Sequence, residues 1–139
     1  MPISFQILHE AALVYVRYTG RAGIQEGREA FTSYLAHPDH RPDQRQLVDL
    51  SGVTDLEQDF VRLFEFQAGK AAAFMKGRAP ILLIYYAPTE ISLRLARSVQ
   101  RSWEGLDGAI VRVITEWDAA ADILGLRPEQ LDLMVRREV

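Results

Sequence analysis

The sequence predicts a single α/β domain built on a mixed, mostly parallel five-stranded sheet. Three short apolar runs are typical of strands that helices cover on both faces: Leu47–Leu50, Ile81–Tyr86 and Ala109–Ile114. Helical patterns follow these runs, and alternating strands and helices favour parallel pairing through right-handed crossovers. The length of 139 residues, of which 48% are hydrophobic, suits one domain with one core.

The first two elements are predicted to be an antiparallel pair of strands. Ile3 to Ile7 alternate apolar and polar residues, which is the period of a half-buried strand. The segment Leu13–Tyr18 is rich in β-branched and aromatic residues, and Thr19-Gly20 is expected to end it. The four residues between the two strands, 9–12, are expected to form the hairpin connection.

A helix is predicted over Gly23–Ala36. Its expected buried face carries Ile24, Phe31 and Leu35. The loop 37–43 follows, because two prolines in five residues cannot lie inside a helix.

The central run, Leu47–Leu50, is predicted to lead through a turn into a helix. Ser51-Gly52 is a turn signal, and Thr54 with Glu57 has the form of a capping box. The expected helix covers 57–75. Because such a turn presents free amides at the positive end of a helix dipole, we take the loop after the central strand as the candidate binding site. Its residues are Asp49, Ser51, Thr54, Asp55 and Gln58.

The second half continues the alternation. Helices are expected over 88–103 and, after the strand Ala109–Ile114, from the segment 115–118 up to a stop at Gly125. With the strand Ile81–Tyr86, this gives the order ββαβαβαβα over residues 1–126. A tail, 127–139, fits one further helix that begins at Pro128. If consecutive strands are neighbours, right-handed crossovers place the helices on one face, so the tail or a second subunit must cover the other. This requirement is the reason to expect a homodimer.

Composition limits the classes of function. The net charge of −3 argues against nucleic-acid binding, and the absence of cysteine excludes disulfides and thiolate metal sites. No run is long enough to span a membrane and the first residues do not resemble a signal peptide, so the expected location is the cytoplasm. Phosphate-binding glycine motifs are also missing, and no cofactor is expected.

Four groups of side chains are candidates for a functional site. His37 and His40 lie in a proline-containing loop, which favours a solvated loop over a metal site. The acids near 55–59 suit a helix start for dipole reasons alone. Ser51 lacks the elbow motif and the histidine of a serine hydrolase. One outer helix face is a candidate patch for an anion or an acidic partner; it carries Arg94, Arg97 and Arg101.

The segment Asp49-Leu50-Ser51-Gly52-Val53 resembles the D-L-S-G-V segment of STAS domains, the anti-sigma-factor-antagonist (SpoIIAA-like) group. The resemblance to the uncharacterised bacterial branch of this group extends in pattern over about residues 3–125. It implies a SpoIIAA-like fold. In antagonists whose serine is phosphorylated, an Asp-Ser-Ser-Gly turn follows this segment. In register, Gln58 takes the serine's place here, and it has no hydroxyl.

The resemblance therefore implies a regulatory, protein-binding module without the phosphorylatable serine. The alternative is a carrier of a small lipid or anion, held between the expected helix 57–75 and the sheet. Catalysis is not expected, because no catalytic group of residues stands out from the sequence.

Overall fold

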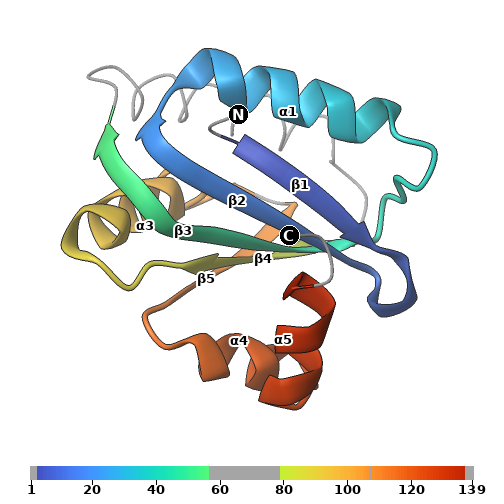
Figure 1. Ribbon diagram of the computed structural model, residues 1–139. Coiled ribbons are helices and arrows are strands. Elements are labelled where there is room, and N and C mark those ends of the chain that lie inside the picture. Colours follow the sequence, from blue (N-terminus) through green and yellow to red (C-terminus); the bar gives the residue numbers. More distant parts are fainter. Residues whose placement is uncertain (1–2, 57–78, 107, 137–139) are drawn as a thin grey trace.

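A computed structural model describes residues 3–56, 79–106 and 108–136. Its centre is one five-stranded sheet in the order β1-β2-β3-β4-β5 (Figure 1). The strands are β1 (Ile3–Leu8), β2 (Leu13–Ala22), β3 (Arg45–Leu56), β4 (Ile81–Tyr86) and β5 (Ala109–Ile114). The helices are α1 (Ile24–Ala36), α3 (Glu90–Ser102), α4 (Trp117–Leu124) and α5 (Pro128–Arg136), with a 3-10 turn, η1, at His9–Ala11. The mixed, mostly parallel five-stranded sheet is confirmed, since only β1 and β2 pair antiparallel.

The order of the described elements is ββαββαβαα, which differs from the expected ββαβαβαβα at two places. The helix expected over 57–75 lies outside the described residues. The tail forms the additional helix α5, which begins at Pro128, where the fixed φ of proline suits the first helical turn.

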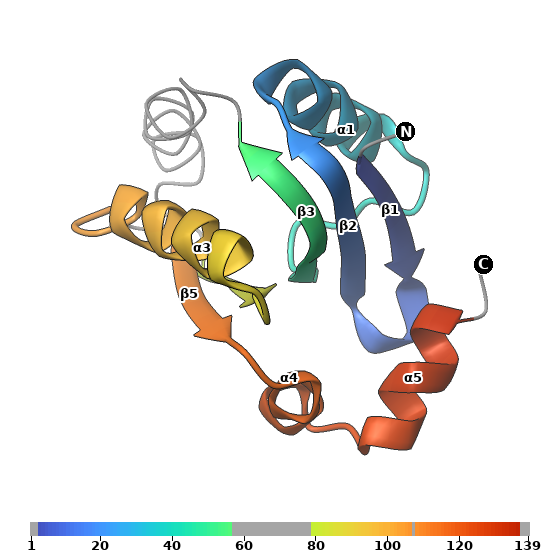
Figure 2. The same cartoon turned by 60° about the vertical axis from the view of Figure 1, so that its left-hand side comes forward.

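Helices cover the two faces of the sheet separately (Figure 2). On one face, α3 packs its buried residues Leu95, Ala96 and Val99 against a cluster that includes Val48 and Leu83. On the opposite face, α4 and α5 pack against Leu13, Leu47 and Ile84. Successive residues of a strand point to opposite faces, so the continuous apolar runs of β3 and β4 supply both clusters.

The tail covers the second face from within the same chain. Leu131 of α5 is fully buried among residues of β2, β3 and β4. The uncovered face that motivated the homodimer is thus filled by the chain itself. Self-association stays a prediction, but the uncovered face is no longer a reason to expect it.

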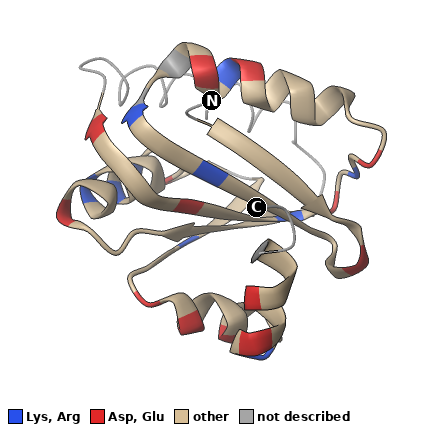
Figure 3. Cartoon of the chain, in the orientation of Figure 1, with Lys and Arg blue, Asp and Glu red and all other residues tan. Residues whose placement is uncertain are grey.

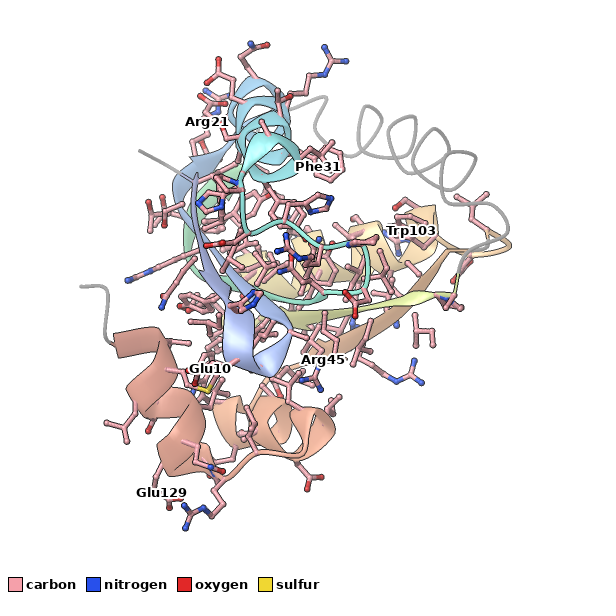
Figure 4. All side chains as sticks on the ribbon, turned by 90° about the vertical axis from the view of Figure 1, so that its right-hand side faces the viewer. Glu10, Arg21, Phe31, Arg45, Trp103 and Glu129 are labelled. Atoms are coloured by element: carbon pink, nitrogen blue, oxygen red, sulfur yellow. The ribbon has the colours of Figure 1, made fainter. Side chains whose placement is uncertain are left out.

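Arg45 connects the second layer to the strand hairpin. Its guanidinium donates to the carbonyl oxygen of Leu124 (3.2 Å) and to that of Ala11 (2.7 Å), and Figure 4 shows it between the hairpin and α4. A cation at a helix C-terminus satisfies free carbonyls and complements the dipole. Arg45 therefore fixes α4 against the start of β3.

The predicted turn at Ser51-Gly52 and the helix start at Thr54 are wrong. β3 continues to Leu56, and β2 continues beyond Thr19-Gly20 to Ala22, because the two strands remain paired to Ala22 and Leu56. Three steps along β3, Asp49 to Gly52, oppose two along β2, Arg17 to Thr19, so β3 carries a bulge here. The turn signal therefore produces an extra residue in a strand rather than a reversal of the chain.

Gly52 is required at this bulge by close packing. A Cβ atom on Gly52 would lie 2.9 Å from both the Tyr18 carbonyl oxygen and the Thr19 Cγ2 atom. Glycine permits this approach of the two backbones because it has no Cβ.

The expected buried face of α1 is wrong at Phe31 and Leu35, and the side chain of Ile24 is not among those that the structure describes. Phe31 is 52% exposed and Leu35 is 46% exposed, and Figure 4 shows the ring of Phe31 on α1. Among the α1 side chains that the structure describes, the buried one is Tyr34, whose ring meets that of Phe5 edge to face at 5.9 Å. In the described part of the chain, no helix combines the length and the hydropathy needed to cross a membrane.

Candidate functional site

Strand pairing places one row of polar side chains across the sheet. Ser4 pairs with Arg17, Arg17 with Asp49, and Asp49 with Tyr86, so these four residues occupy adjacent strands in register. Paired residues point to the same face, at spacings of about 4.8 Å between strands. Figure 3 shows the blue segment on β2 beside the red segment on β3. We call Ser4, Arg17, Asp49 and Tyr86 the polar row.

The polar row lies beside the region that α5 covers. The neighbouring row on the same face runs through Gln6, Tyr15, Leu47 and Ile84. Gln6 Nε2 donates to the carbonyl oxygen of Met134 in α5 (3.1 Å), so α5 covers the β1 end of this neighbouring row. Ser4 and Arg17 are exposed, so the polar row is open at its β1–β2 end.

Three donors hold the carboxylate of Asp49. The Tyr15 hydroxyl donates to Oδ2 at 2.5 Å, and the Ser51 amide and Ser51 hydroxyl donate to Oδ1 at 2.9 and 2.6 Å. The Asp49 residue is only 7% exposed. An aspartate that bonds the amide two residues ahead offers the backbone a local alternative to the ladder, which explains the bulge at this position.

Aromatic rings fix the end of the row at β4. The Tyr86 ring lies 5.1 Å from the Trp117 ring and the Tyr15 ring lies 6.3 Å from it, both nearly edge to face. The indole Nε1 of Trp117 donates to Asp132 Oδ1 at 2.8 Å, which ties this ring to α5. The two tyrosines therefore have fixed orientations through packing on one tryptophan.

The hydroxyl groups of Tyr15 and Tyr86 keep their protons at neutral pH, so both are able to donate a hydrogen bond. Burial, then the hydrogen bond to Asp49, raises the pKa of Tyr15 above its ordinary value. Burial, then the charges of Asp49 and Glu116, raises the pKa of Tyr86. Both carboxylates add a negative contribution to the potential around Tyr86.

The cation of the row, Arg17, is not paired with the carboxylate beside it. No hydrogen bond or ion pair joins the Arg17 guanidinium to the Asp49 carboxylate. Within residues 3–56, 79–106 and 108–136, the one ion pair joins Arg21 Nε and Asp55 Oδ2 at 3.9 Å. Arg17 is exposed and has five donors that can bind a carboxylate in bidentate geometry.

The structure brings together two of the five predicted loop residues. Asp49 and Ser51 are bonded to each other, but they lie in a strand and not in a loop. Thr54 and Asp55 are exposed near the end of β3, so Thr54 does not begin a helix at that point. Gln58 lies outside the described residues.

The predicted arginine patch lies on the outer face of α3, away from Asp49. Arg94, Arg97 and Arg101 are all exposed, opposite the buried Leu95 and Val99. Arg101 donates to the Ser98 hydroxyl at 3.3 Å. This geometry suits a solvated amphipathic helix as well as a binding patch.

The loop with His37 and His40 is held by a buried glutamine. Gln44 is 2% exposed; its Oε1 accepts from the Tyr34 hydroxyl (2.6 Å) and its Nε2 donates to the Asp39 carbonyl oxygen (2.9 Å). His37 Nδ1 accepts from the Asp39 amide. Of the residues described, no three with metal-binding side chains gather in one place.

Five residues of the site were not singled out from the sequence: Ser4, Tyr15, Arg17, Tyr86 and Trp117. A usable signal existed, because Asp49 and Tyr86 both lie near the ends of apolar runs, and ligands of parallel sheets bind beyond the carboxyl ends of strands. Arg17 had no such signal, since its neighbour depends on the register of β2 against β3.

Neither models of protein families nor curated proteins give a match to this chain.

Proposed function

We propose that the protein is a non-catalytic regulatory module of the STAS-like type that binds a protein partner through the polar row. One observation carries the proposal. Asp49 is immobilised by three donors and nearly buried, while Arg17 and Ser4 in the same row are exposed. A surface with fixed polar groups loses little side-chain freedom when a partner binds.

The state of Asp49 supports binding rather than chemistry. A general base needs a lone pair within reach of the proton that it removes. Asp49 accepts three hydrogen bonds inside the protein, so its carboxylate serves to position Tyr15 and Ser51.

The strand order and the D-L-S-G-V segment support the STAS-like part of the proposal. Consecutive strands β2 to β5 are neighbours and parallel, which agrees with the mostly parallel sheet expected for a fold of this type. The polar row includes Asp49 of this segment, and Ser51 is bonded to it.

The proposal includes no phosphorylation switch at Ser51. Its hydroxyl donates to Asp49 at 2.6 Å, and a phosphate there would bring nearly two negative charges beside a carboxylate. Intact-mass measurement and peptide mapping of protein from its native cells test this point. Stoichiometric phosphate on Ser51 or Thr54 would contradict it.

The principal test is site-specific photo-crosslinking in the native cells. A photoreactive residue replaces exposed Ser4 at the end of the row, and a matched variant carries it at exposed Glu129 on α5 (Figure 4). We expect one protein to crosslink at position 4 and not at 129, and the purified partner to bind the full chain in solution.

Two results would overturn the binding-module proposal. Equal crosslinking at both positions would remove the row as the contact. Native mass spectrometry that shows a retained small molecule, with no protein crosslinked at position 4, would favour the alternative of a lipid or anion carrier.

A further inference from the structure

We propose that Arg17 is the anchor of the polar row and binds one carboxylate, supplied by an aspartate or glutamate side chain of the protein partner. This inference rests on the proposed function, and it names the chemistry of the contact. The groups of the row differ in whether they can make further hydrogen bonds to a partner.

The row offers donors. Asp49, its one carboxylate, already accepts three hydrogen bonds. Arg17 keeps its guanidinium exposed, and Ser4, its register partner on β1, is exposed beside it. A partner that matches this end of the row must therefore present acceptors, and a carboxylate is the acceptor that fits the fork of an arginine.

The charges around the row select among acceptors. Asp49 lies one strand from Arg17, and both Asp49 and Glu116 act on Tyr86. Repulsion from these carboxylates grows in proportion to the charge of the incoming group. For a dianionic phosphate, the repulsion from these carboxylates and the attraction to the Arg17 guanidinium are both about twice those of a carboxylate, but the cost of removing the ion from water grows with the square of its charge. Beside two carboxylates, which offset part of the attraction, the singly charged carboxylate is therefore favoured.

The far end of the row suits an apolar neighbour of that acid. Tyr86 and Trp117 are half-buried, and their edge-to-face packing fixes both rings. An apolar side chain next to the acid in the partner can cover this aromatic pair, because the row spans about 10 Å from β2 to β4.

The test is a titration of the isotope-labelled full chain, followed by NMR. The probe is a terminally blocked peptide with one glutamate followed by leucine. Matched peptides carry glutamine or phosphoserine in place of the glutamate. We expect the Arg17 side-chain signal and the Ser4 and Asp49 amides to shift with saturation for the glutamate peptide, and at least tenfold weaker binding of the other two.

Two protein variants make the result specific. Arg17→Gln should weaken binding of the glutamate peptide at least tenfold. Arg112→Gln serves as the control, since Arg112 is an exposed strand arginine whose guanidinium donates to its own chain at the Val111 carbonyl oxygen (3.2 Å). This control should bind as the unchanged protein does. Binding should also weaken as salt rises, because exposed charges are screened.

Three outcomes would overturn the inference. They are equal binding of the glutamine peptide, tighter binding of the phosphoserine peptide, and equal loss in both arginine variants. The failure of the proposed function is separate, because it appears as absent or unspecific crosslinking at position 4. A partner that crosslinks there without carboxylate binding would retain the function and refute only the role of Arg17.

Discussion

The two faces of the sheet are built from the same strands, but one face is apolar throughout its cluster and the other carries the polar row. On the face of α3, Val48, Leu50 and Leu83 join one apolar cluster that also holds Trp103. On the face of α4 and α5, the buried residues of the apolar cluster end at Leu47 and Ile84 on β3 and β4. The polar row comes next along these strands, with Tyr86 half-buried against the cluster. The comparison shows that an open polar surface can share strands with a filled core, because side chains alternate between faces.

The largest effect is expected where the two faces are alike. Leu83→Ala on the α3 side and Ile84→Ala on the α4 side should each lower the free energy of unfolding by about 2–5 kcal/mol, through lost transfer energy and a residual cavity. Both residues are buried, with 8% and 0% exposure. Urea denaturation measures both. A loss below about 1 kcal/mol for either would remove that face from the core.

Gly52→Ala tests the bulge that separates the polar row from the rest of β3. A Cβ atom would lie 2.9 Å from the Tyr18 carbonyl oxygen, so the strands must move apart. We expect a loss of about 1–3 kcal/mol in a chemical melt. Gly125→Ala is not a suitable control because its φ is +73°; Ala30→Gly, within α1, measures ordinary backbone effects instead. An unchanged melt would mean that β2 and β3 are not closely paired here.

Asp49→Ala tests whether the carboxylate holds the row together. The substitution leaves the Tyr15 hydroxyl and the Ser51 donors without their acceptor, which should cost about 1–3 kcal/mol. Asp49→Asn keeps one acceptor oxygen and should cost less. Thermal denaturation of both variants measures the difference. If the two variants lost the same stability, hydrogen bonding to Asp49 would not be the cause.

The difference in stability between Tyr15→Phe and the unchanged protein is expected to depend on pH in the alkaline range. At pH 7 the substitution should cost about 0.5–1.5 kcal/mol through the lost bond to Asp49. Because the pKa of Tyr15 is raised in the folded state, the unfolded chain releases this proton above about pH 10 while the folded chain keeps it. The free energy of unfolding of the unchanged protein therefore falls as pH rises. The difference in this free energy between the unchanged protein and Tyr15→Phe should become smaller. Denaturant melts at pH 8 and pH 11 measure this, and a constant difference would contradict it.

The smallest effect is expected at Arg17. Because its side chain is exposed and bonds to no residue that the structure describes, Arg17→Gln should change the free energy of unfolding by less than about 0.5 kcal/mol. The same variant should lose binding. A loss above about 1 kcal/mol in a melt would show that Arg17 supports the fold instead.

The sequence by itself determined most elements. The bounds of β4 and β5 agree with the predicted ranges, and α4 ends before Gly125 as predicted, because each is a local pattern closed by proline or glycine signals. The α3 helix begins at its Thr89 cap, and the Thr89 and Ser92 side chains bond each other's backbone amides. Asp49 and Ser51 were also identified, since they follow a buried run.

Only the tertiary structure decided what those residues do. The signals at 51–54 predicted a turn and a helix, and pairing with β2 overrode them, because each added ladder bond stabilises an extended chain. Phe31 was expected inside because helical spacing defines a face, but not which face meets the sheet. The polar row depends on register across four strands. Register is a property of pairing between distant segments, so no local pattern could place Arg17 beside Asp49.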